Sequence, residues 1–421
     1  MNPSLEAYPK VIPAGREARV DVRGLDASTA FAAGATYAAR FFSKVNRTED
    51  STFEATADAS GVLHLALGFA SAGEYALDLS RRGEEKVLAT EVFFALDPAL
   101  AALRPYKGDV HLHTVGSDGR RSAAAMALAA REAGLDFIAI TDHDKYEPSL
   151  EAAEASARLG LDLVAMPGEE VTILEAGGHV LSLNASRGVG PLRQGPAADV
   201  ERARIVRDEL AGRALAPPLT AARYAHAVWT VRKVREFGGA AVLAHPYWEG
   251  TARKLYPPPA VVEQLLADGL CDGLELVGGS PTVEGNRLAI ARHVEEAHRG
   301  RLLPVVGGSD AHGDEDLGAY WTVVFARERT AKGIVGAIRD LKSVACDRKT
   351  GRQVAIYGPF ALVQYAYFLD REYYPLHDPI CRAQAALARR IFLDASADHR
   401  AALAALAADL AALERRFWDE S

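Results

Sequence analysis

The stretch K-G-D-V-H-L-H-T-V-G-S-D-G, residues 107–119, carries the first indication of both fold and chemistry. Its apolar part holds His111 and His113 two positions apart, and on a β-strand this spacing places both imidazoles on one face. Asp118 follows in a glycine-rich turn, where the chain can reverse direction. One strand end therefore offers two nitrogen ligands and a carboxylate to a metal ion. H-x-H pairs also occur on strands that bind no metal, so the stretch alone leaves both interpretations open.

The composition is that of a globular protein with an acidic balance. The chain has 421 residues, of which 49% are apolar and 25% are charged. These values allow a sizeable core and favour one large domain with a smaller one. The net charge of -8 argues against a general basic surface. We therefore expect a small phosphorylated substrate, no nucleic-acid partner and no membrane partner, and a homo-oligomer is left open.

Cysteine usage and the N-terminal sequence indicate a reducing compartment. Cys271, Cys346 and Cys381 are far apart and show no C-x-x-C spacing, which argues against a disulfide framework and a zinc-thiolate site. The first ten residues lack the basic and apolar regions of a secretion signal, and no apolar run approaches the length of a membrane span. We expect a soluble, cytoplasmic protein.

Residues 1–105 have the pattern of a small all-β sandwich domain. Alternating apolar and polar residues occur in five segments separated by turn sequences, at 18–22, 36–42, 62–67, 74–79 and 86–96. Short strands at this spacing are typical of a sandwich. His64 is isolated there, without a group of metal-binding side chains around it. We therefore expect a structural or lid role for this domain.

From residue 106 to residue 345, short apolar strands alternate with helices, which predicts a barrel built on a parallel sheet. Residues 185–238 form a long insertion with two helices, expected at 199–212 and 221–237. Insertions of this length in barrels are usually functional, and this one could cover the mouth. We expect helical structure from Arg327 onward, with 346–421 as a helical C-terminal extension.

Side chains that can bind metals follow the ends of these strands, where barrel sites are built. They are six histidines and three carboxylates: His111, His113, His143, His179, His245, His312, Asp118, Glu170 and Asp310. His179 opens its strand, so it fits only if that strand runs the other way. Nine nitrogen and oxygen ligands exceed the needs of one ion and suit two or three Zn, Mn or Fe ions. Such sites activate water and stabilise the attacking and leaving oxygens, which is hydrolytic chemistry.

Six motifs in fixed order resemble the PHP (polymerase and histidinol phosphatase) family of metallohydrolases. They are D-V-H-L-H-T-x-x-S-D-G, I-T-D-H, P-G-x-E, G-H-V-L, A-H-P and G-G-S-D-A-H, and the resemblance covers about residues 106–340. The N-terminal β domain makes the chain most similar to the CehA/McbA-type branch. The resemblance implies a distorted (β/α)7 barrel, a trinuclear metal site and phosphoesterase activity by attack of a metal-bound hydroxide.

Carried over by position, the resemblance also distributes the ligands among three ions. His111, His113, Glu170 and Asp310 would hold the first, Glu170 would bridge to a second held by His179 and His245, and Asp118, His143 and His312 would hold the third. It implies Glu170 rather than Glu169 as the ligand, and Asp142 as a residue that orients a histidine. We expect the catalytic residues to be Asp118, His143, Glu170, Asp310 and His312.

Substrate contacts are expected from residues that closely follow the motif strands, namely Arg120, Lys145, Arg187, Tyr247 and Trp248. An arginine or lysine there could bind phosphate, and each could equally be a solvated surface charge. The aromatic residues could stack on the substrate or line the cleft. Segment 275–279 lacks an asparagine that the branch often shows, which leaves the substrate open. The alternative on the same site is a metal-dependent ester, amide or carbamate hydrolase, and a third is a non-catalytic scaffold.

Overall fold

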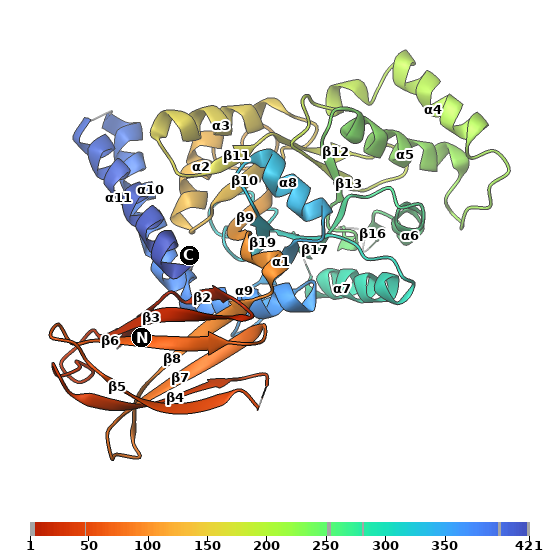
Figure 1. Ribbon diagram of the computed structural model, residues 1–421. Coiled ribbons are helices and arrows are strands. Elements are labelled where there is room, and N and C mark those ends of the chain that lie inside the picture. The colour runs from red at the N-terminus through yellow and green to blue at the C-terminus, as the bar shows by residue number, and fades with distance from the viewer. Residues whose placement is uncertain (1–4, 47, 251–253, 280–281, 395–396, 419–421) are drawn as a thin grey trace. The chain divides into compact units, whose positions relative to one another are not determined.

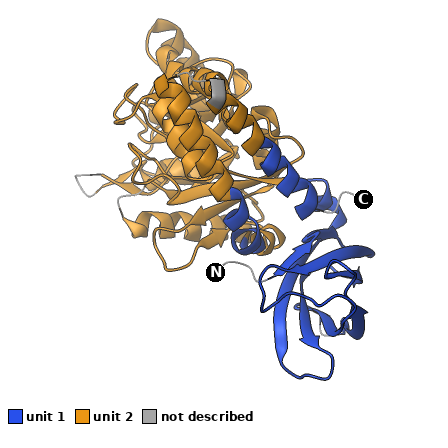
Figure 2. Ribbon diagram, turned by 90° about the vertical axis from the view of Figure 1, so that its left-hand side faces the viewer, with its two compact units in different colours: residues 1–103, 367–377, 407–421 blue, residues 104–366, 378–406 orange. Residues whose placement is uncertain are grey.

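The computed structural model describes residues 5–46, 48–250, 254–279, 282–394 and 397–418. The chain forms two compact units, one of residues 1–103, 367–377 and 407–421 and the other of residues 104–366 and 378–406 (Figure 2). The prediction that no secretion signal is present concerns the first ten residues. Of these, residues 1–4 lie outside the described residues. Among the described helices, none combines the length and the apolar character that crossing a bilayer would need.

The first unit contains two β-sheets (Figure 1). One has the order β1 (Leu5–Tyr8), β3 (Arg16–Gly24), β6 (Val62–Phe69). The other has the order β2 (Val11–Pro13), β8 (Val87–Leu96), β7 (Gly73–Arg81), β4 (Thr36–Ser43), β5 (Asp50–Thr56). Alternate residues of β3 are buried, because successive side chains of a strand point to opposite faces. Val20 and Val22 thereby join Leu77 and Phe93 in one apolar core, which contains residues of both sheets.

The second unit contains the strands that carry the predicted ligands, arranged in two larger sheets. The first has the order β11 (Val164–Met166), β10 (Phe137–Ile140), β9 (Arg104–Leu112), β19 (Tyr320–Ala326), β20 (Ser343–Asp347), β21 (Ala355–Tyr357). The second has the order β12 (Gly168–Thr172), β13 (His179–Leu183), β14 (Ala240–Leu243), β17 (Gly273–Gly278), β18 (Val305–Gly308). A small hairpin is formed by β15 (Trp248–Glu249) and β16 (Leu255–Tyr256).

Helices connect these strands, and four of the seven that follow begin after a capping side chain. The seven are α2 (Ala123–Glu132), α3 (Glu147–Leu159), α4 (Pro196–Asp208), α5 (Ala221–Glu236), α6 (Pro259–Ala267), α7 (Val283–His298) and α8 (Ala331–Arg339). The side chains of Ser122, Thr220, Thr282 and Thr330 each accept a hydrogen bond from a backbone N–H of the first turn, which satisfies a donor that the helix leaves free. Short helices lie at Pro98–Ala101 (α1) and Gly190–Leu192 (η1). The chain ends with α9 (Phe360–Glu372), α10 (Tyr374–Asp394) and α11 (Ala397–Phe417).

The mixed α/β architecture agrees with the sequence, while two local expectations need correction. The sheets are not purely parallel, because β13 is antiparallel to both β12 and β14, and β19 is antiparallel to both β9 and β20. The reversed direction of β13 removes the difficulty with His179. The chain beyond Arg327 is not helical throughout, because residues 343–347 and 355–357 are strands that extend the first sheet.

Candidate metal centre

The strand ends bring all nine predicted ligands into one cluster. His111 lies on β9 and His113 directly follows it, Glu170 lies on β12 and His179 opens β13. The others follow strands: His143 after β10, His245 after β14, and Asp310 and His312 after β18, with Asp118 in the turn after β9. Because β13 runs antiparallel to β14, its first residue lies at the same edge of the sheet as the end of β14.

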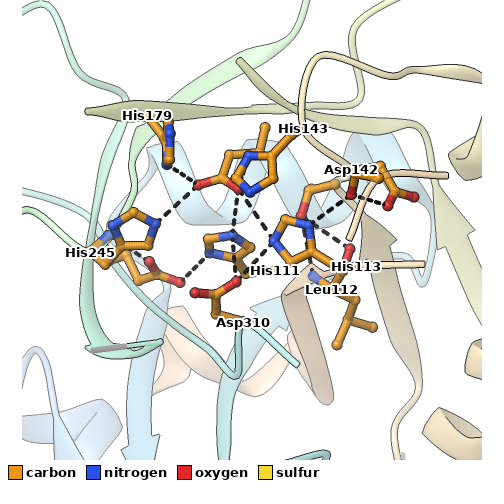
Figure 3. Close-up of polar contacts among 12 residues, drawn as sticks. His111, Leu112, His113, Asp142, His143, His179, His245 and Asp310 are labelled. Carbon is orange, nitrogen blue, oxygen red and sulfur yellow. Dashed lines mark hydrogen bonds and ion pairs between the residues drawn. The ribbon is translucent and has the colours of Figure 1, made fainter. Parts of the chain in front are cut away.

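Glu170 is the residue that most cluster members contact, and it is fully buried. Its Oε2 lies 3.0 to 3.3 Å from a ring nitrogen of His111, His113 and His143. Its Oε1 lies 2.8 Å from His179 Nδ1 and 3.0 Å from His245 Nε2. Figure 3 labels these five histidines. Glu169 points elsewhere, since its carboxylate accepts hydrogen bonds from the backbone N–H groups of Val189 and Gly190. The alternation of side chains along β12 therefore separates the two glutamates.

Asp310 and Asp118 contact the histidines on two further sides of the cluster. Asp310 Oδ1 lies 2.9 Å from His113 Nε2 and 3.4 Å from His111 Nε2. Asp118 Oδ2 lies 3.2 Å from His312 Nε2 and 3.6 Å from His143 Nε2. Asp118 is the most exposed of the nine, with a side chain 52% accessible. The cluster therefore has a buried base and an edge that solvent and substrate can reach.

The donor atoms form four overlapping groups that are compact enough to surround ions. Within each group the atoms lie no more than 4.8 Å apart. The groups are His113, Asp118, His143 and His312; His111, Glu170 and His245; His111, His113 and Asp310; and His143, Glu170 and His179. All nine predicted ligands belong to at least one of them. A single ion could not use nine donors, so the arrangement offers positions for more than one.

Buried donor atoms without a hydrogen bond are the main evidence that this cluster suits cations. Six atoms of the described cluster residues are in this state: His111 Nε2, His113 Nε2, His179 Nδ1, His245 Nδ1, Glu170 Oε2 and Asp310 Oδ1. Leaving a buried polar atom without a partner costs about 1–3 kcal/mol. Imidazole and carboxylate are the ligands that Zn, Mn and Fe accept. The donor set therefore fits divalent transition metals.

The electrostatics of the cluster keep its carboxylates ionised. Burial alone would raise the pKa of Asp310, but the nearby His111 and His113 outweigh it and hold that pKa at about 2. Burial would lower the pKa of His113, but Asp310 and Glu170 raise it to about 9. The pKa of Glu170 is likewise held well below its ordinary value against the effect of burial. At neutral pH the carboxylates are thus ionised and His113 holds a proton, which a bound cation would displace.

The backbone around the cluster is shaped to bring these side chains together. Asp310 and His245 adopt positive φ angles of 52° and 21°, which non-glycine residues rarely adopt. A Cβ on Gly279 would lie 2.2 Å from Asp310 Oδ2, so only glycine allows that approach. Strained backbone of this kind persists where the surroundings enforce it, and it is frequent at functional sites.

Two further carboxylates support the cluster, one of them unexpected. Glu275 of β17 is buried, its Oε1 lies 3.0 Å from His111 Nδ1, and its Oε2 accepts a hydrogen bond from the backbone N–H of His245. Its sequence signal is a lone acid inside the apolar strand G-L-E-L-V-G. Asp142, predicted to orient a histidine, instead accepts hydrogen bonds from the backbone N–H and hydroxyl of Thr114 and from the hydroxyl of Ser117. It thereby fixes the turn between His113 and Asp118.

A cavity of about 460 Å³ opens onto the exposed edge of the cluster. Besides six cluster members, its lining includes Trp248, Tyr256, Ser309, Asp316, Tyr320 and Lys349. Among the residues predicted to bind substrate, Trp248 is part of this lining. The other four are not part of this lining. Arg120 pairs with Glu315, and Arg187 lies over the Phe237 ring. Tyr247 accepts a hydrogen bond from Arg292, and Lys145 is exposed. Tyr256 and Lys349 were not predicted, because only the fold brings them to the cavity.

Comparison with known proteins connects the chain to PHP proteins. Residues 292–343 match the family described as PHP-associated. A 78-residue segment is 36% identical to the 5'-3' exoribonuclease Rnm of Escherichia coli K12, and the match spans 27% of that protein's length. The family match confirms the predicted PHP resemblance for the segment that it covers.

Three solved structures show low similarity to this chain. One is a two-domain protein from Bacteroides vulgatus containing a predicted PHP-like metal-dependent phosphoesterase, with 22% identity and a TM-score of 0.41 over 58% of this chain and 66% of that one. Another is a metal-dependent phosphoesterase candidate from Bifidobacterium adolescentis, with 24% identity and a TM-score of 0.34 over 49% of this chain and 88% of that one. A third is an amidohydrolase from Chromobacterium violaceum with bound sulfate, with 22% identity and a TM-score of 0.34 over 50% of this chain and 89% of that one.

Proposed function

We propose that this chain, whose residues 292–343 match the PHP-associated family, is a PHP-type metal-dependent phosphoesterase. The observation that carries the proposal is the convergence of nine nitrogen and oxygen donors, six of whose buried atoms lack a hydrogen bond. Without a cation, five of these atoms are compensated only by ion pairs within the cluster, and a bound cation would supply the ligation that they lack. The proposal includes the finer fold assignment, a distorted (β/α)7 barrel preceded by a β-sandwich.

We assign the donors to two or three Zn, Mn or Fe ions. His111, His113, Glu170 and Asp310 would hold one, Glu170, His179 and His245 a second, and Asp118, His143 and His312 a third. When bound, such ions supply an activated water and stabilise the charge that develops on the oxygens of the reacting ester. The third set contains the most exposed side chains, with His143 at 33%, His312 at 36% and Asp118 at 52%. These three side chains are therefore placed to touch the substrate.

One basic side chain of the cavity could pair with a substrate phosphate. Among the described residues that line it, Lys349 is the one lysine or arginine. Its Nζ lies 2.6 Å from Asp316 Oδ1, and both side chains are substantially exposed. Because such an exposed ion pair contributes only about 0–1 kcal/mol, Lys349 can exchange it for a substrate phosphate at little cost. Hydrolysis of an ester, amide or carbamate on the same centre is the alternative.

The size and charge of the molecule favour a small substrate. The net charge of -8 opposes the binding of extended nucleic acid. One segment of the chain matches part of an enzyme named as an exoribonuclease. RNA is therefore the alternative substrate that the experiment must include. We also propose a cytoplasmic location, because Cys271, Cys346 and Cys381 form no disulfide.

The test combines metal analysis with a substrate panel. Purified protein should contain two or three transition-metal ions per chain and cleave an aryl phosphate faster than an aryl carbamate, an aryl ester or a short RNA. His111→Ala and Asp310→Ala should lose both metal and activity, whereas Glu263→Ala on the exposed face of α6 should retain both. Protein that arrives without metal and stays inert after addition of Mn, Fe or Zn would disprove the proposal. A preference for the carbamate or the ester would support the alternative.

A further inference from the structure

Two aromatic side chains form one side of the cavity beside the metal centre. Trp248 and Tyr256 are paired across the β15–β16 hairpin, and both line the cavity. Cross-strand partners direct their side chains to the same face, with Cβ atoms about 4.5–5.5 Å apart. Both residues are only half-buried. Adjacent aromatic rings therefore remain accessible from inside the cavity.

These rings border the centre directly. The ring centroid of Trp248 lies 6.3 Å from that of His245, and the centroid of Tyr256 lies 5.7 Å from that of His179. The backbone N–H of Trp248 also donates a hydrogen bond to the carbonyl oxygen of His245. A group attached to a reacting phosphate would therefore meet aromatic surface on this side.

The position of Tyr256 depends on two glycines that precede His179. Gly177 and Gly178 adopt positive φ angles of 83° and 87°. A Cβ on Gly177 would lie 2.9 Å from the Tyr256 ring, and a Cβ on Gly178 would lie 2.5 Å from Pro257. The segment before His179 thus has room for the hairpin only because side chains are absent there. The same glycines join the aromatic surface to a proposed metal ligand.

Lys349 marks a different part of the cavity. Its partner Asp316 lies four residues after His312, so the lysine belongs with the loop that carries this histidine. The backbone N–H groups of Lys349 and Thr350 both donate to Asp347 Oδ1, which fixes the turn that presents the lysine. The cavity therefore combines an aromatic side near His179 and His245 with a cation near the His312 loop.

We propose, resting on the proposed phosphoesterase function, that the substrate is a phosphate ester whose leaving group carries a planar ring. The ring would stack on Trp248 and Tyr256, and Lys349 would pair with the phosphate. In the reaction, water adds to phosphorus and the bond between phosphorus and the ester oxygen breaks. The ring-bearing alcohol leaves with a proton, and inorganic phosphate is the second product. Stacking is indifferent to the identity of the ring, so aryl and nucleoside esters share this chemistry.

The first experiment measures binding to the metal-loaded full chain. Calorimetry compares phenylphosphonate with methylphosphonate, neither of which can be hydrolysed. Wild-type protein should bind the phenyl compound about tenfold more tightly, which corresponds to about 1.4 kcal/mol. Trp248→Leu and Tyr256→Leu should each reduce this ratio at least threefold. Phe360→Leu, which makes the same kind of change at a residue that is 76% exposed, should keep the ratio. Lys349→Met should weaken the binding of both phosphonates by a similar factor.

Turnover measurements then distinguish aryl esters from nucleoside esters. They also test the ring preference separately from the phosphoesterase function. Phenyl phosphate is compared with methyl phosphate, and adenosine 5'-monophosphate with ribose 5-phosphate, using kcat/KM ratios in wild type and in both leucine variants. A protein that cleaves phosphate esters but binds both phosphonates equally would overturn the ring preference alone. Ring preference in binding without cleavage of any ester would instead overturn the phosphoesterase function. If a leucine variant fails to fold, the ratio of the two phosphonate affinities in the wild-type protein still tests the ring preference.

Discussion

At the scale of single residues, the cluster depends on a carboxylate that is not one of its nine donors. Glu275 contacts His111 at Nδ1 and the backbone N–H of His245. A carboxylate on one ring nitrogen fixes the orientation of an imidazole and directs the other nitrogen to its ligand. In His111, that other nitrogen is the Nε2 atom facing Glu170 and Asp310. Glu275 is therefore a positioning residue of the proposed centre.

We predict that Glu275→Gln weakens divalent metal binding about 10–100-fold, the usual effect of losing such a partner. The amide keeps the size of the side chain but removes the charge that orients His111. Competition with a chromophoric chelator measures the affinity. Glu263→Gln serves as the matched control, because Glu263 pairs with Arg292 on an exposed face. Equal metal affinity in the two variants would contradict the positioning role.

His64 shows how a contact at this scale escapes sequence analysis. It has no neighbouring acid in its own strand segment, yet its Nδ1 lies 2.6 Å from Asp21 on β3 and its Nε2 lies 3.2 Å from Asp58. Strand pairing creates this arrangement, since Asp21 and His64 are register partners. The hydrogen bonds to Asp21 and then Asp58 raise the pKa of His64 above its ordinary value of 6.5.

A raised pKa means that the folded state holds the proton more tightly than the unfolded state does. The resulting stabilisation is fully present below the unfolded pKa and disappears as the pH rises through the raised folded pKa. Wild-type protein should therefore lose more unfolding free energy than His64→Gln between about pH 6 and pH 8. Denaturant unfolding of both proteins at the two pH values measures this difference. If the difference in unfolding free energy between wild type and His64→Gln is the same at both pH values, the raised pKa of His64 is contradicted.

At the scale of elements, strand ends were predictable and strand direction was not. Short apolar runs followed by His143, Glu170, His245 and Asp310 identified one edge of the sheet, because polar groups at such ends gather there. The direction of β13 was left open by the sequence, because its pairing with β14 depends on a segment far along the chain. Lys349 reaches the cavity through the turn after β20, in a region expected to be helical. Such contacts follow from tertiary packing rather than from periodicity.

The junction between β13 and the β15–β16 hairpin offers a test of element packing. Gly178→Ala combines a positive φ of 87° with a Cβ that would meet Pro257 at 2.5 Å. Gly238→Ala has a similar φ of 79° but open space around its Cβ. We predict a loss of about 1 kcal/mol of unfolding free energy for Gly238→Ala and at least about 2 kcal/mol for Gly178→Ala. Denaturant unfolding measures both losses. Equal losses of unfolding free energy would mean that a Cβ at position 178 does not clash with Pro257.

At the scale of the whole molecule, the proposed centre ties together distant parts of the chain. The nine donors extend from His111 to His312, yet all belong to the second unit. They come from strands of both of its large sheets. Ions bound there would therefore link the two sheets at one edge. The first unit contributes none of these donors, so the effect of metal should differ between the two units.

Metal binding should consequently stabilise the molecule unevenly. A ligand that binds only the folded state at about 100 times its Kd adds about 2.7 kcal/mol to the stability of the region that must unfold to release it. Addition of Mn or Zn to chelator-treated protein should slow amide hydrogen exchange in β9, β12, β13 and β14. Exchange in β3, β6 and β7 should stay within error, and Asp310→Ala should abolish the slowing. A uniform change across both units would indicate general binding of ions to an acidic protein. Protection confined to the second unit instead requires a site built from its two sheets.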